Sequence, residues 1–304
     1  MLRIFVAGGT GVIGRRVVPA LVGAGYRVSV ASRSEEGDAR LVAMGASPVS
    51  VDLYDRDDVQ RAVGHQDVVI NLATHMPPSS AKMMLPWSWR ENDRVRRLVS
   101  SNLADAARAG AADLFVQESY APIYEDGGDQ WIDESWPVRP TSAARSVIDA
   151  ERAANRFNKH GGRGIVLRFA NFYGPDGFAT REVIGMVKKG LCPLPGAPDA
   201  FISSVSHDDA ATAVVAAIHL PAGTYNVSDD EPLTRREWLD SLAKALGVKT
   251  PGMLPGWLVK LGGSRTELLG RSQRISSRKL RESSDWQPAT PCIRDAWPAL
   301  VRAM

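Results

Sequence analysis

Glycines near the start of the chain are spaced so that backbone amides can hold a phosphate. The segment VAGGTGVIG (6–14) lies between a short apolar run and an amphipathic stretch. Its glycines at 8, 11 and 14 suit a tight turn, close approach of backbone to a pyrophosphate, and tight packing of helix on strand. The N–H groups that begin the next helix favour an anion. The alternative is a tight turn that has a structural role alone. We expect a dinucleotide to contact Gly8, Thr10, Gly11, Val12, Ile13 and Gly14.

The residues after the second expected strand indicate which dinucleotide binds. A site for NAD usually has an acid there for the ribose 2′-hydroxyl, whereas a site for NADP often has an arginine for the 2′-phosphate. This chain has Ser32 and Arg33 and reaches its first acid only at Glu35. A guanidinium can hold a phosphate with two hydrogen bonds, whereas a carboxylate repels it. The sequence therefore favours NADP(H) over NAD(H), unless Arg33 is only a solvated loop charge.

Two further segments end expected strands and can lie beneath the adenosine. VDLYD puts Asp52 and Leu53 after the third strand, and NLAT puts Leu72, Ala73 and Thr74 after the fourth. Open α/β sheets bind ligands at the carboxyl ends of their strands. These residues are therefore also expected to contact the cofactor.

Alternating strands and helices must position these groups. Strands are expected at 2–7, 27–31, 47–52, 67–73, 113–119, 164–170 and 223–228, and helices at 12–24, 55–64, 88–110, 140–160, 179–189, 208–219 and 234–247. This alternation predicts an α/β fold with a Rossmann-type, doubly wound parallel sheet and a smaller C-terminal substrate lobe. We expect the dinucleotide-binding domain at 1–170, with 203–228 returning to it. The substrate-binding lobe is expected at 171–202 and 229–304.

Composition and charge argue against several other functions. The 304 residues include 37 basic and 34 acidic side chains without a basic block, so no nucleic-acid partner is expected. Cys192 and Cys292 show no metal-ligand spacing and suit a reducing compartment. No signal peptide and no apolar run of about 18 residues is found, so we expect a cytoplasmic protein without a membrane span. The five histidines suggest no metal site, and SHDD (206–209) favours a helix N-cap.

Several segments spread along most of the chain together resemble one enzyme family. They are GGTGVIG, NLAT, Asn92, LRFANFYGP (167–175), SSVSHDDAATAVVAAI (203–218) and GTYNVSDDEPLT (223–234). In this combination the chain resembles the extended short-chain dehydrogenase/reductases, the NAD(P)-dependent epimerases and dehydratases. The resemblance implies a Rossmann sheet for the cofactor, a lobe for a small-molecule substrate, and often a homodimer built from helices. It also implies cofactor contacts from Asn92 and Ala170 and substrate contacts from Asn171 and Tyr173.

The proton-transfer residues of that family are missing from this chain. The family has a Ser or Thr near the end of the fifth strand and a Tyr-x-x-x-Lys pair on the next helix. The tyrosine pKa is ordinarily about 10, so a nearby cation must lower it for work at neutral pH. None of the six tyrosines here is followed by lysine four residues later. Aligning on Ser146 and Glu151 puts Ala143 and Val147 at the two family positions.

An enzyme with relocated proton transfer is the favoured interpretation. Tyr120 stands where the family has its serine, counting back from Tyr124, and Ser119 precedes it. Tyr120 or Tyr124 would move the proton, Ser119 would hydrogen-bond the substrate, and Arg145 would lower the tyrosine pKa or bind an anionic substrate. The alternatives are a space-filling aromatic at Tyr120 and a surface pair of Arg145 with Asp149. The expected activity is that of an NADP(H)-dependent reductase or epimerase-like oxidoreductase.

Two other functions stay open for the same fold. The lost Tyr and Lys also suit an NADP-binding sensor or regulator that moves no proton. A redox-neutral isomerase, dehydratase or cyclase is the third alternative. His75 follows the fourth strand and can reach a substrate, or it is a capping or exposed histidine.

Overall fold

The computed structural model describes residues 1–83, 85–253 and 263–304, and of residues 80, 81, 143 and 263–266 the backbone alone. The side chain expected to replace the family's tyrosine, Ala143, therefore lies outside the described part. Among the described helices, none is both long enough and apolar enough to cross a membrane.

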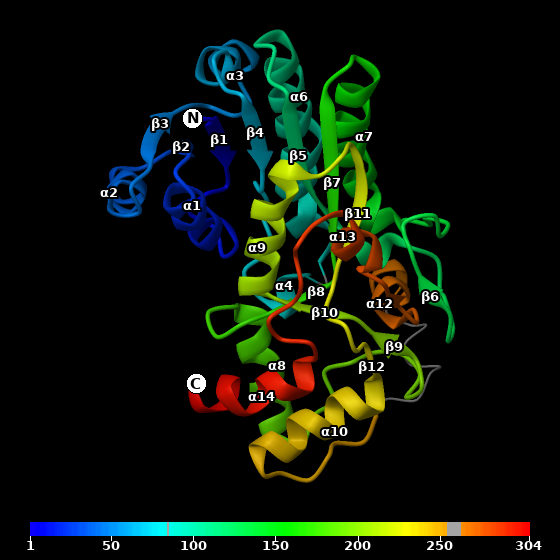
Figure 1. Cartoon of the computed structure of the whole chain (residues 1–304). Coiled ribbons are helices and arrows are strands. Elements are labelled where there is room, and N and C mark those ends of the chain that lie inside the picture. Colours follow the sequence, from blue (N-terminus) through cyan, green and yellow to red (C-terminus); the bar gives the residue numbers. More distant parts are fainter. Residues whose placement is uncertain (84, 254–262) are drawn as a thin grey trace.

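Seven parallel strands form the central sheet (Figure 1). They are β1 (Arg3–Ala7), β2 (Arg27–Ser32), β3 (Ser47–Ser50), β4 (Val68–Asn71), β5 (Leu114–Tyr120), β7 (Arg163–Phe169) and β11 (Gly223–Val227). Their order is β11-β7-β5-β4-β1-β2-β3, so the strand order reverses between β1 and β4. This confirms the doubly wound Rossmann-type fold. The carboxyl ends of β1 and β4 meet at the point of reversal, where such sheets bind ligands.

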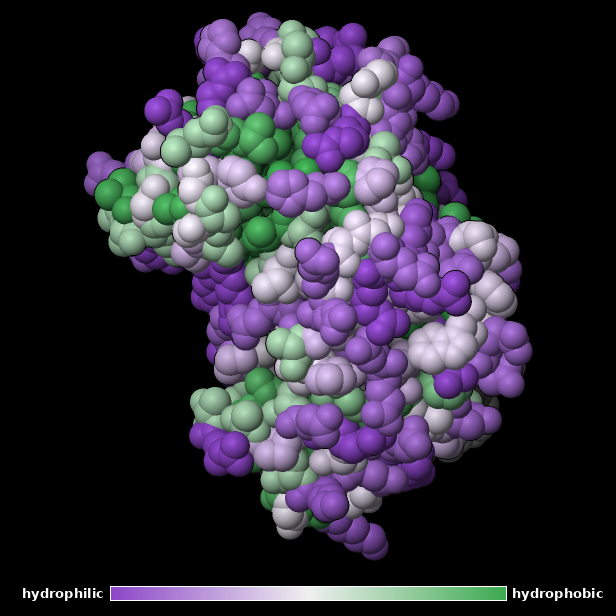
Figure 2. Space-filling view, in the orientation of Figure 1, coloured by the Kyte–Doolittle hydropathy of each residue, from purple (hydrophilic) through white to green (hydrophobic). Residues whose placement is uncertain are grey.

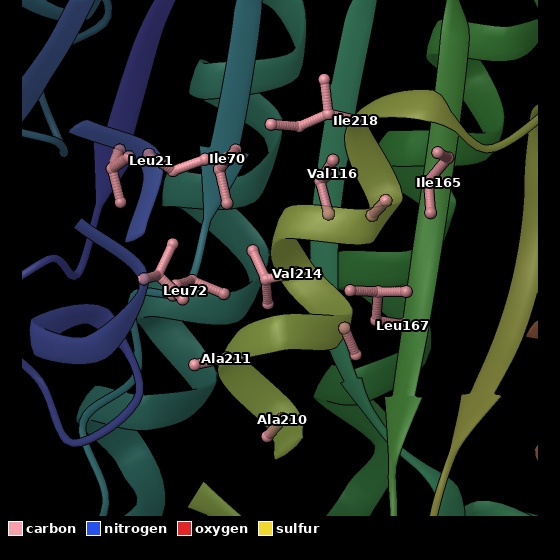
Figure 3. Packing of buried hydrophobic residues seen from close by; sticks show 14 of the residues in the cluster. Leu21, Ile70, Leu72, Val116, Ile165, Leu167, Ala210, Ala211, Val214 and Ile218 are labelled. Atoms are coloured by element: carbon pink, nitrogen blue, oxygen red, sulfur yellow. The ribbon is translucent and has the colours of Figure 1, made fainter. Parts of the chain in front are cut away.

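One face of the sheet is covered mainly by two helices, and the second of them has mostly small inward-facing side chains. They are α1 (Gly14–Gly23) and α9 (His207–Ala216). Figure 3 shows Ala211 and Val214 of α9 beside Leu72, at the end of β4, within one buried cluster. Alanines on the inner side of α9 allow its backbone to approach the strands closely, as dense core packing requires. Ser206 accepts a hydrogen bond from the Asp209 amide, which confirms the predicted N-cap of this helix.

The opposite face is covered by three helices. They are α3 (Arg56–Val63), α6 (Ser100–Ala109) and α7 (Arg145–Lys159), and α2 (Glu35–Ala43) lies at the β2–β3 edge. Val59, Leu103 and Phe157 pack there against Phe5 and Phe115. The burial of strand side chains on both faces explains why the strands read as continuous apolar runs.

The long helix expected at 88–110 is interrupted. The chain forms a 3-10 turn, η1 (Pro86–Trp89), then α5 (Arg90–Arg94), a π-helical turn, η2 (Val95–Val99), and α6. A π turn contains one extra residue per hydrogen-bonded loop, so it changes which side chains face the core. Val95, Arg96 and Val99 are buried in this turn. The buried arginine, Arg96, therefore lies in a segment for which the 3.6-residue period of apolar residues predicts only a regular helix.

The lower half of Figure 1 is a smaller lobe built mainly from helices. Its core joins α8 (Phe178–Lys188), α10 (Arg235–Leu246) and α14 (Ile293–Arg302), with Trp238 and Trp297 meeting edge to face. The predicted capping box of Thr234 with Glu237, and a left-handed Gly247 after the helix, are both present in α10.

Short strand pairs and helices complete the structure. The pairs are β8 (Asn171–Tyr173) with β10 (Ser204–Ser206), β9 (Phe201–Ile202) with β12 (Leu233–Thr234), and β6 (Trp131–Ile132) with β13 (Arg274–Ile275). The remaining helices are α4 (Ser80–Met83), η3 (Ala121–Ile123), η4 (Ser142–Ala144), η5 (Ala217–His219), α12 (Gly263–Gly270) and α13 (Arg278–Ser283). Figure 2 shows a step in the surface beneath α1 and α2, where the sheet half overhangs the lobe.

Candidate functional site

The turn between β1 and α1 contains two positions that only glycine can occupy. Gly8 has a φ of +83°, and a Cβ on it would lie 2.6 Å from the carbonyl carbon of Leu72. A Cβ on Gly14 would collide with the Gly8 carbonyl oxygen and the Gly9 backbone. Gly11 N donates to that same oxygen at 3.1 Å and closes the turn. The turn is therefore held by backbone packing against the end of β4.

The rim of this turn fits a bound dinucleotide. Thr10, Gly11 and Val12 are exposed, and Ile13 is half-buried. Ile13 stands at the N-cap of α1 and makes no side-chain capping bond, and the amides of Arg15 and Arg16 donate to the carbonyls of Gly11 and Ile13. The positive end of the helix dipole favours an anion at this rim. These residues fit the dinucleotide that the family resemblance implies.

Gly14→Ala is expected to raise the Kd for NADPH by at least about 10-fold and to lower the free energy of unfolding by about 1–3 kcal/mol, since the added methyl must displace the turn. Gly23→Ala is the matched control, because a Cβ at this position of the same helix meets nothing within 4 Å. Cofactor titration and urea unfolding measure the two effects. Equal affinities for the two variants would contradict a role of the tight turn in binding.

The residues expected at the adenosine end gather around Tyr54. Ser32 is buried at the end of β2, whereas Arg33 and Asp52 are exposed. Asp52 Oδ1 accepts from the Tyr54 amide at 2.9 Å, and the Arg94 guanidinium lies 4.0 Å from the Tyr54 ring centre. Burial raises the pKa of Tyr54 to about 12, against the opposing charges of Arg94 and Arg33. Arg33 and Arg94 therefore lie close enough to one phenol for their charges to act on it.

The segment after β4 is fixed by an amide from the long helix. Asn92 is fully buried, and its Oδ1 accepts from the His75 amide at 2.9 Å. The side chains of Thr74 and His75 are exposed, and Leu72 is buried beneath the glycine-rich turn. The structure thus brings Leu72, Ala73, Thr74 and His75 to the carboxyl edge of the sheet. Asn92 acts on this segment through the backbone.

Ser119 belongs to a buried ionic network between β5, α7 and β7. Its Oγ donates to Glu151 Oε1 at 2.6 Å. Both oxygens of Glu151 accept from Arg168, at 2.8 and 2.7 Å, in a bidentate pair. Burial alone would lower the pKa of Arg168, but the hydrogen bonds and charge of Glu151 raise it. In this structure the Ser119 hydroxyl is engaged in holding the network.

Tyr124 extends the same network toward β11. Its side chain is fully buried, and its hydroxyl donates to Asn226 Oδ1 at 2.8 Å. The Arg168 guanidinium lies 4.8 Å from its ring centre. Burial raises the pKa of Tyr124 to about 12, although Arg168 opposes the shift. The phenol is thus enclosed by protein and neutral at ordinary pH.

Tyr120 lies at the end of β5 and remains partly exposed. Its hydroxyl donates to Asn171 Oδ1 at 3.1 Å, and its ring packs beside Ile123 and Val147. Burial raises its pKa to about 12, while the positive charge of Arg96 opposes the shift. Of the two tyrosines expected to move a proton, Tyr124 is fully buried, whereas Tyr120 is half-buried and lies near the positive charge of Arg96.

The cation near Tyr120 differs from the expected one. Arg145 is the exposed first residue of α7, and Asp149 pairs with Arg152 at 2.9 Å. The charge that acts on the Tyr120 phenol is that of Arg96, which the sequence analysis missed. The sequence did contain a signal for Arg96. It is a charged residue four positions after Asn92 and therefore on the same face of the expected long helix.

An ion-pair cluster that the sequence analysis also missed joins α1 to the lobe. Asp176 accepts from Arg15, from Arg16 at 2.7 Å and from His207 Nδ1 at 2.8 Å. Arg16 also pairs with Asp208. Burial opposes ionisation of Asp176, but the hydrogen bonds from Arg16 and His207 hold its pKa below the usual range. Burial lowers the pKa of His207.

The remaining expected site residues lie nearer the lobe. Ala170 is buried at the end of β7, and Asn171 begins β8 as the acceptor for Tyr120. Tyr173 is buried in the lobe core, and burial raises its pKa. Among the described residues, no group of three or more His, Cys, Asp or Glu is placed to hold a metal ion.

The site lies where known dinucleotide enzymes of this architecture bind their cofactor. The model of the NAD dependent epimerase/dehydratase family matches residues 4–228, which include the glycine-rich turn and all seven sheet strands. The chain belongs to the NAD-dependent epimerase/dehydratase family. It is therefore an oxidoreductase-type chain of an NAD(P)-dependent family.

Members of the epimerase/dehydratase family resemble this chain over nearly its whole length. A 3-diazoavenalumate denitrifying reductase from Streptomyces sp is 32% identical over 97% of this chain and 98% of its own length. The NAD complex of the UDP-glucose 4-epimerase from Thermus thermophilus is 26% identical, with a TM-score of 0.75 and 99% coverage of both chains. Human epimerase family protein SDR39U1 with NADPH shares the fold, with a TM-score of 0.77, 19% identity and full coverage of both chains.

Proposed function

We propose that this chain is an NADP(H)-dependent reductase that acts on a small organic substrate at the carboxyl ends of β4 and β5. The observation that carries the proposal is Tyr120, a half-buried residue at the end of β5 whose hydroxyl is hydrogen-bonded to Asn171. The likeness to a reductase along 97% of the chain supports the same activity.

The acidity of Tyr120 favours reduction over epimerisation. A phenol with a pKa of about 12 stays protonated at neutral pH. In the protonated form it can give a proton to an alkoxide, which is a much stronger base than a phenolate, but it cannot remove one. An epimerase that oxidises and then reduces needs both steps, whereas a reductase needs the donation alone.

The proposed roles follow from the contacts of each side chain. Bound NADPH supplies the two electrons of the reduction. The single O–H of Tyr120 donates to Asn171 in the free protein, and in the proposed reaction it turns to the acceptor oxygen of the substrate and gives it the proton. Water then returns a proton to the phenolate. Val147 and Ile123 form an apolar wall beside Tyr120 that limits access of water. Ser119 and Tyr124 support this arrangement from the buried network.

A diazo compound is a second candidate substrate. The Streptomyces relative is named as a reductase that denitrifies 3-diazoavenalumate. Replacing an aryl diazonium group by hydrogen takes up one hydride and releases N2, so the balance needs no proton from a side chain. The loss of the family's Tyr and Lys is compatible with such a reaction. Reduction of a diazonium substrate does not require the Tyr120 proton, whereas reduction of a carbonyl substrate does.

Turnover with defined substrates tests the proposal. Loss of NADPH absorbance with a 3-oxo acid or an aryl diazonium salt, matched by reduced product, is the expected result. Substrate conversion without net loss of NADPH would instead indicate a redox-neutral isomerase or dehydratase. Tight NADPH binding without any turnover, accompanied by a change of shape between the NADP+ and NADPH complexes, would indicate a regulator.

Preference for NADP(H) is proposed to rest on Arg33. Arg33→Asp is expected to weaken NADPH binding by about 10- to 100-fold and to leave NADH binding within a few-fold, since an acid repels the 2′-phosphate. Arg40→Asp is the control, because Arg40 is an exposed arginine in α2, beyond the end of β2. Titration of both cofactors gives the ratio. Equal losses of NADPH and NADH affinity in Arg33→Asp would contradict the assignment.

A further inference from the structure

The π-helical turn places an arginine in an unusual setting beside the proposed reaction site. The Arg96 side chain is only 8% exposed although it stands on a helix that borders the carboxyl edge of the sheet. Its charge reaches the Tyr120 phenol. Removing a guanidinium from water costs several kcal/mol unless its partners are well placed, so such a residue calls for strong compensation.

The compensation within the protein is incomplete. Arg96 meets Glu118 through a single contact of 3.4 Å, whereas Arg168 and Glu151 form two contacts below 3 Å. Within the described part of the chain, Arg96 Nε and Glu118 Oε2 have no hydrogen-bond partner. A bidentate guanidinium–carboxylate contact has two short bonds, so the Arg96–Glu118 pair is a loose one.

A second donor on the same helix face also lacks a partner. Asn92 precedes Arg96 by four residues, which places the two side chains on neighbouring turns of one face. Its Oδ1 is taken by the His75 amide, but its Nδ2 has no acceptor in the described residues. Arg96 thus lies beside Glu118 of β5, and Asn92, one turn earlier on the helix, is a second buried donor with unused hydrogen-bonding capacity.

We propose that Arg96 and Asn92 form the subsite that anchors a carboxylate of the substrate. The donors suit a planar anion with two acceptor oxygens, which Arg96 can hold in a fork while Asn92 donates to one oxygen. In the free protein Arg96 makes a loose contact with the carboxylate of Glu118. The substrate carboxylate replaces Glu118 as the main partner of Arg96. This inference rests on the proposed function in placing the substrate beside Tyr120.

The opposite effects of two substitutions test the subsite. Calorimetry on NADPH-loaded protein compares hexanoate, benzoate and cinnamate with the corresponding uncharged alcohols. Arg96→Met is expected to weaken carboxylate binding by about 10- to 100-fold and to leave alcohol binding unchanged. Arg96→Lys is expected to retain part of the preference. Glu118→Gln is expected to tighten carboxylate binding several-fold because it removes the competing anion.

A purely structural ion pair predicts a different pattern. In that case Arg96→Met and Glu118→Gln weaken the binding of acids and alcohols alike, because either change disturbs the same pair. That pattern, or equal binding of acid and alcohol by the unaltered protein, overturns the subsite. If Arg96→Met does not fold, Arg96→Lys and Glu118→Gln decide alone through their opposite shifts.

Binding and turnover are measured separately, so the inference and the proposed function can fail independently. Carboxylate binding that depends on Arg96 in a protein without NADPH turnover would keep the subsite and remove the reductase. Turnover of a 3-oxo acid and of an uncharged ketone that respond alike to Arg96→Lys and to Glu118→Gln would keep the reductase and remove the subsite.

Discussion

Tyr120→Phe is expected to lower kcat for a carbonyl substrate by about 100-fold or more, while the Kd for NADPH stays the same, because only the proton donor is lost. In the unaltered protein, kcat should be level from about pH 6 to pH 10. It should fall only as the pH approaches the phenol pKa of about 12, since the donor must be protonated. Stopped-flow and steady-state measurements over pH test both statements.

Tyr124→Phe is the matched control for this prediction. Tyr124 is also a tyrosine with a raised pKa, but its hydroxyl is enclosed and bonded to Asn226. Its loss should lower the free energy of unfolding by about 1–3 kcal/mol, through the unpaired Asn226, and change kcat little. A kcat that falls only in Tyr124→Phe would reverse the assignment. With an aryl diazonium salt, a fully active Tyr120→Phe would support the proton-free reduction.

Glu151→Gln is expected to lower the free energy of unfolding by about 3–5 kcal/mol, because it leaves the buried guanidinium of Arg168 without its counter-charge. Both side chains are nearly sealed from water, at 6% and 9% exposure, and share two short hydrogen bonds. Urea unfolding measures the loss as a lower midpoint at an unchanged slope.

The control for Glu151 lies on the same helix. Asp149 pairs with Arg152 at the surface, where a single ion pair contributes about 0–1 kcal/mol. Asp149→Asn should therefore change stability by less than about 1 kcal/mol. The double variant Glu151→Leu with Arg168→Met should recover much of the loss, since it removes both buried charges together. Equal costs for Glu151→Gln and Asp149→Asn would mean that the buried pair is not a major stabilising contact.

The parts of the fold that depend on local sequence could be predicted. The strand and helix periods, the glycine spacing at 8, 11 and 14, and the capping pair Thr234–Glu237 are all read within a few residues. The π-helical turn at 95–99 could not be predicted. The period of apolar residues indicates a helix, but it does not indicate which carbonyl each backbone amide bonds to. That choice depends on what packs against the helix.

The site was predicted unevenly for a related reason. The glycine-rich turn is contiguous in sequence, so its residues were predicted together as a dinucleotide site. The environment of Ser119 and Tyr124 depends on Glu151, Arg168 and Asn226, which come from different elements. Sequence reasoning identified the two tyrosines but could not tell that Tyr124 is fully buried and Tyr120 half-buried. Arg96 was missed although its spacing of four residues from Asn92 was a signal, because charged residues on helices are usually solvated.

The Asp176 cluster makes the two halves of the molecule energetically interdependent. One carboxylate holds Arg15 and Arg16 at the start of the phosphate-facing helix and, with its other oxygen, His207 at the start of α9. A ligand that draws either arginine away from Asp176 works against these bonds. Whatever free energy passes in this way from the cofactor turn to the lobe must pass equally in the reverse direction, because such linkage is reciprocal.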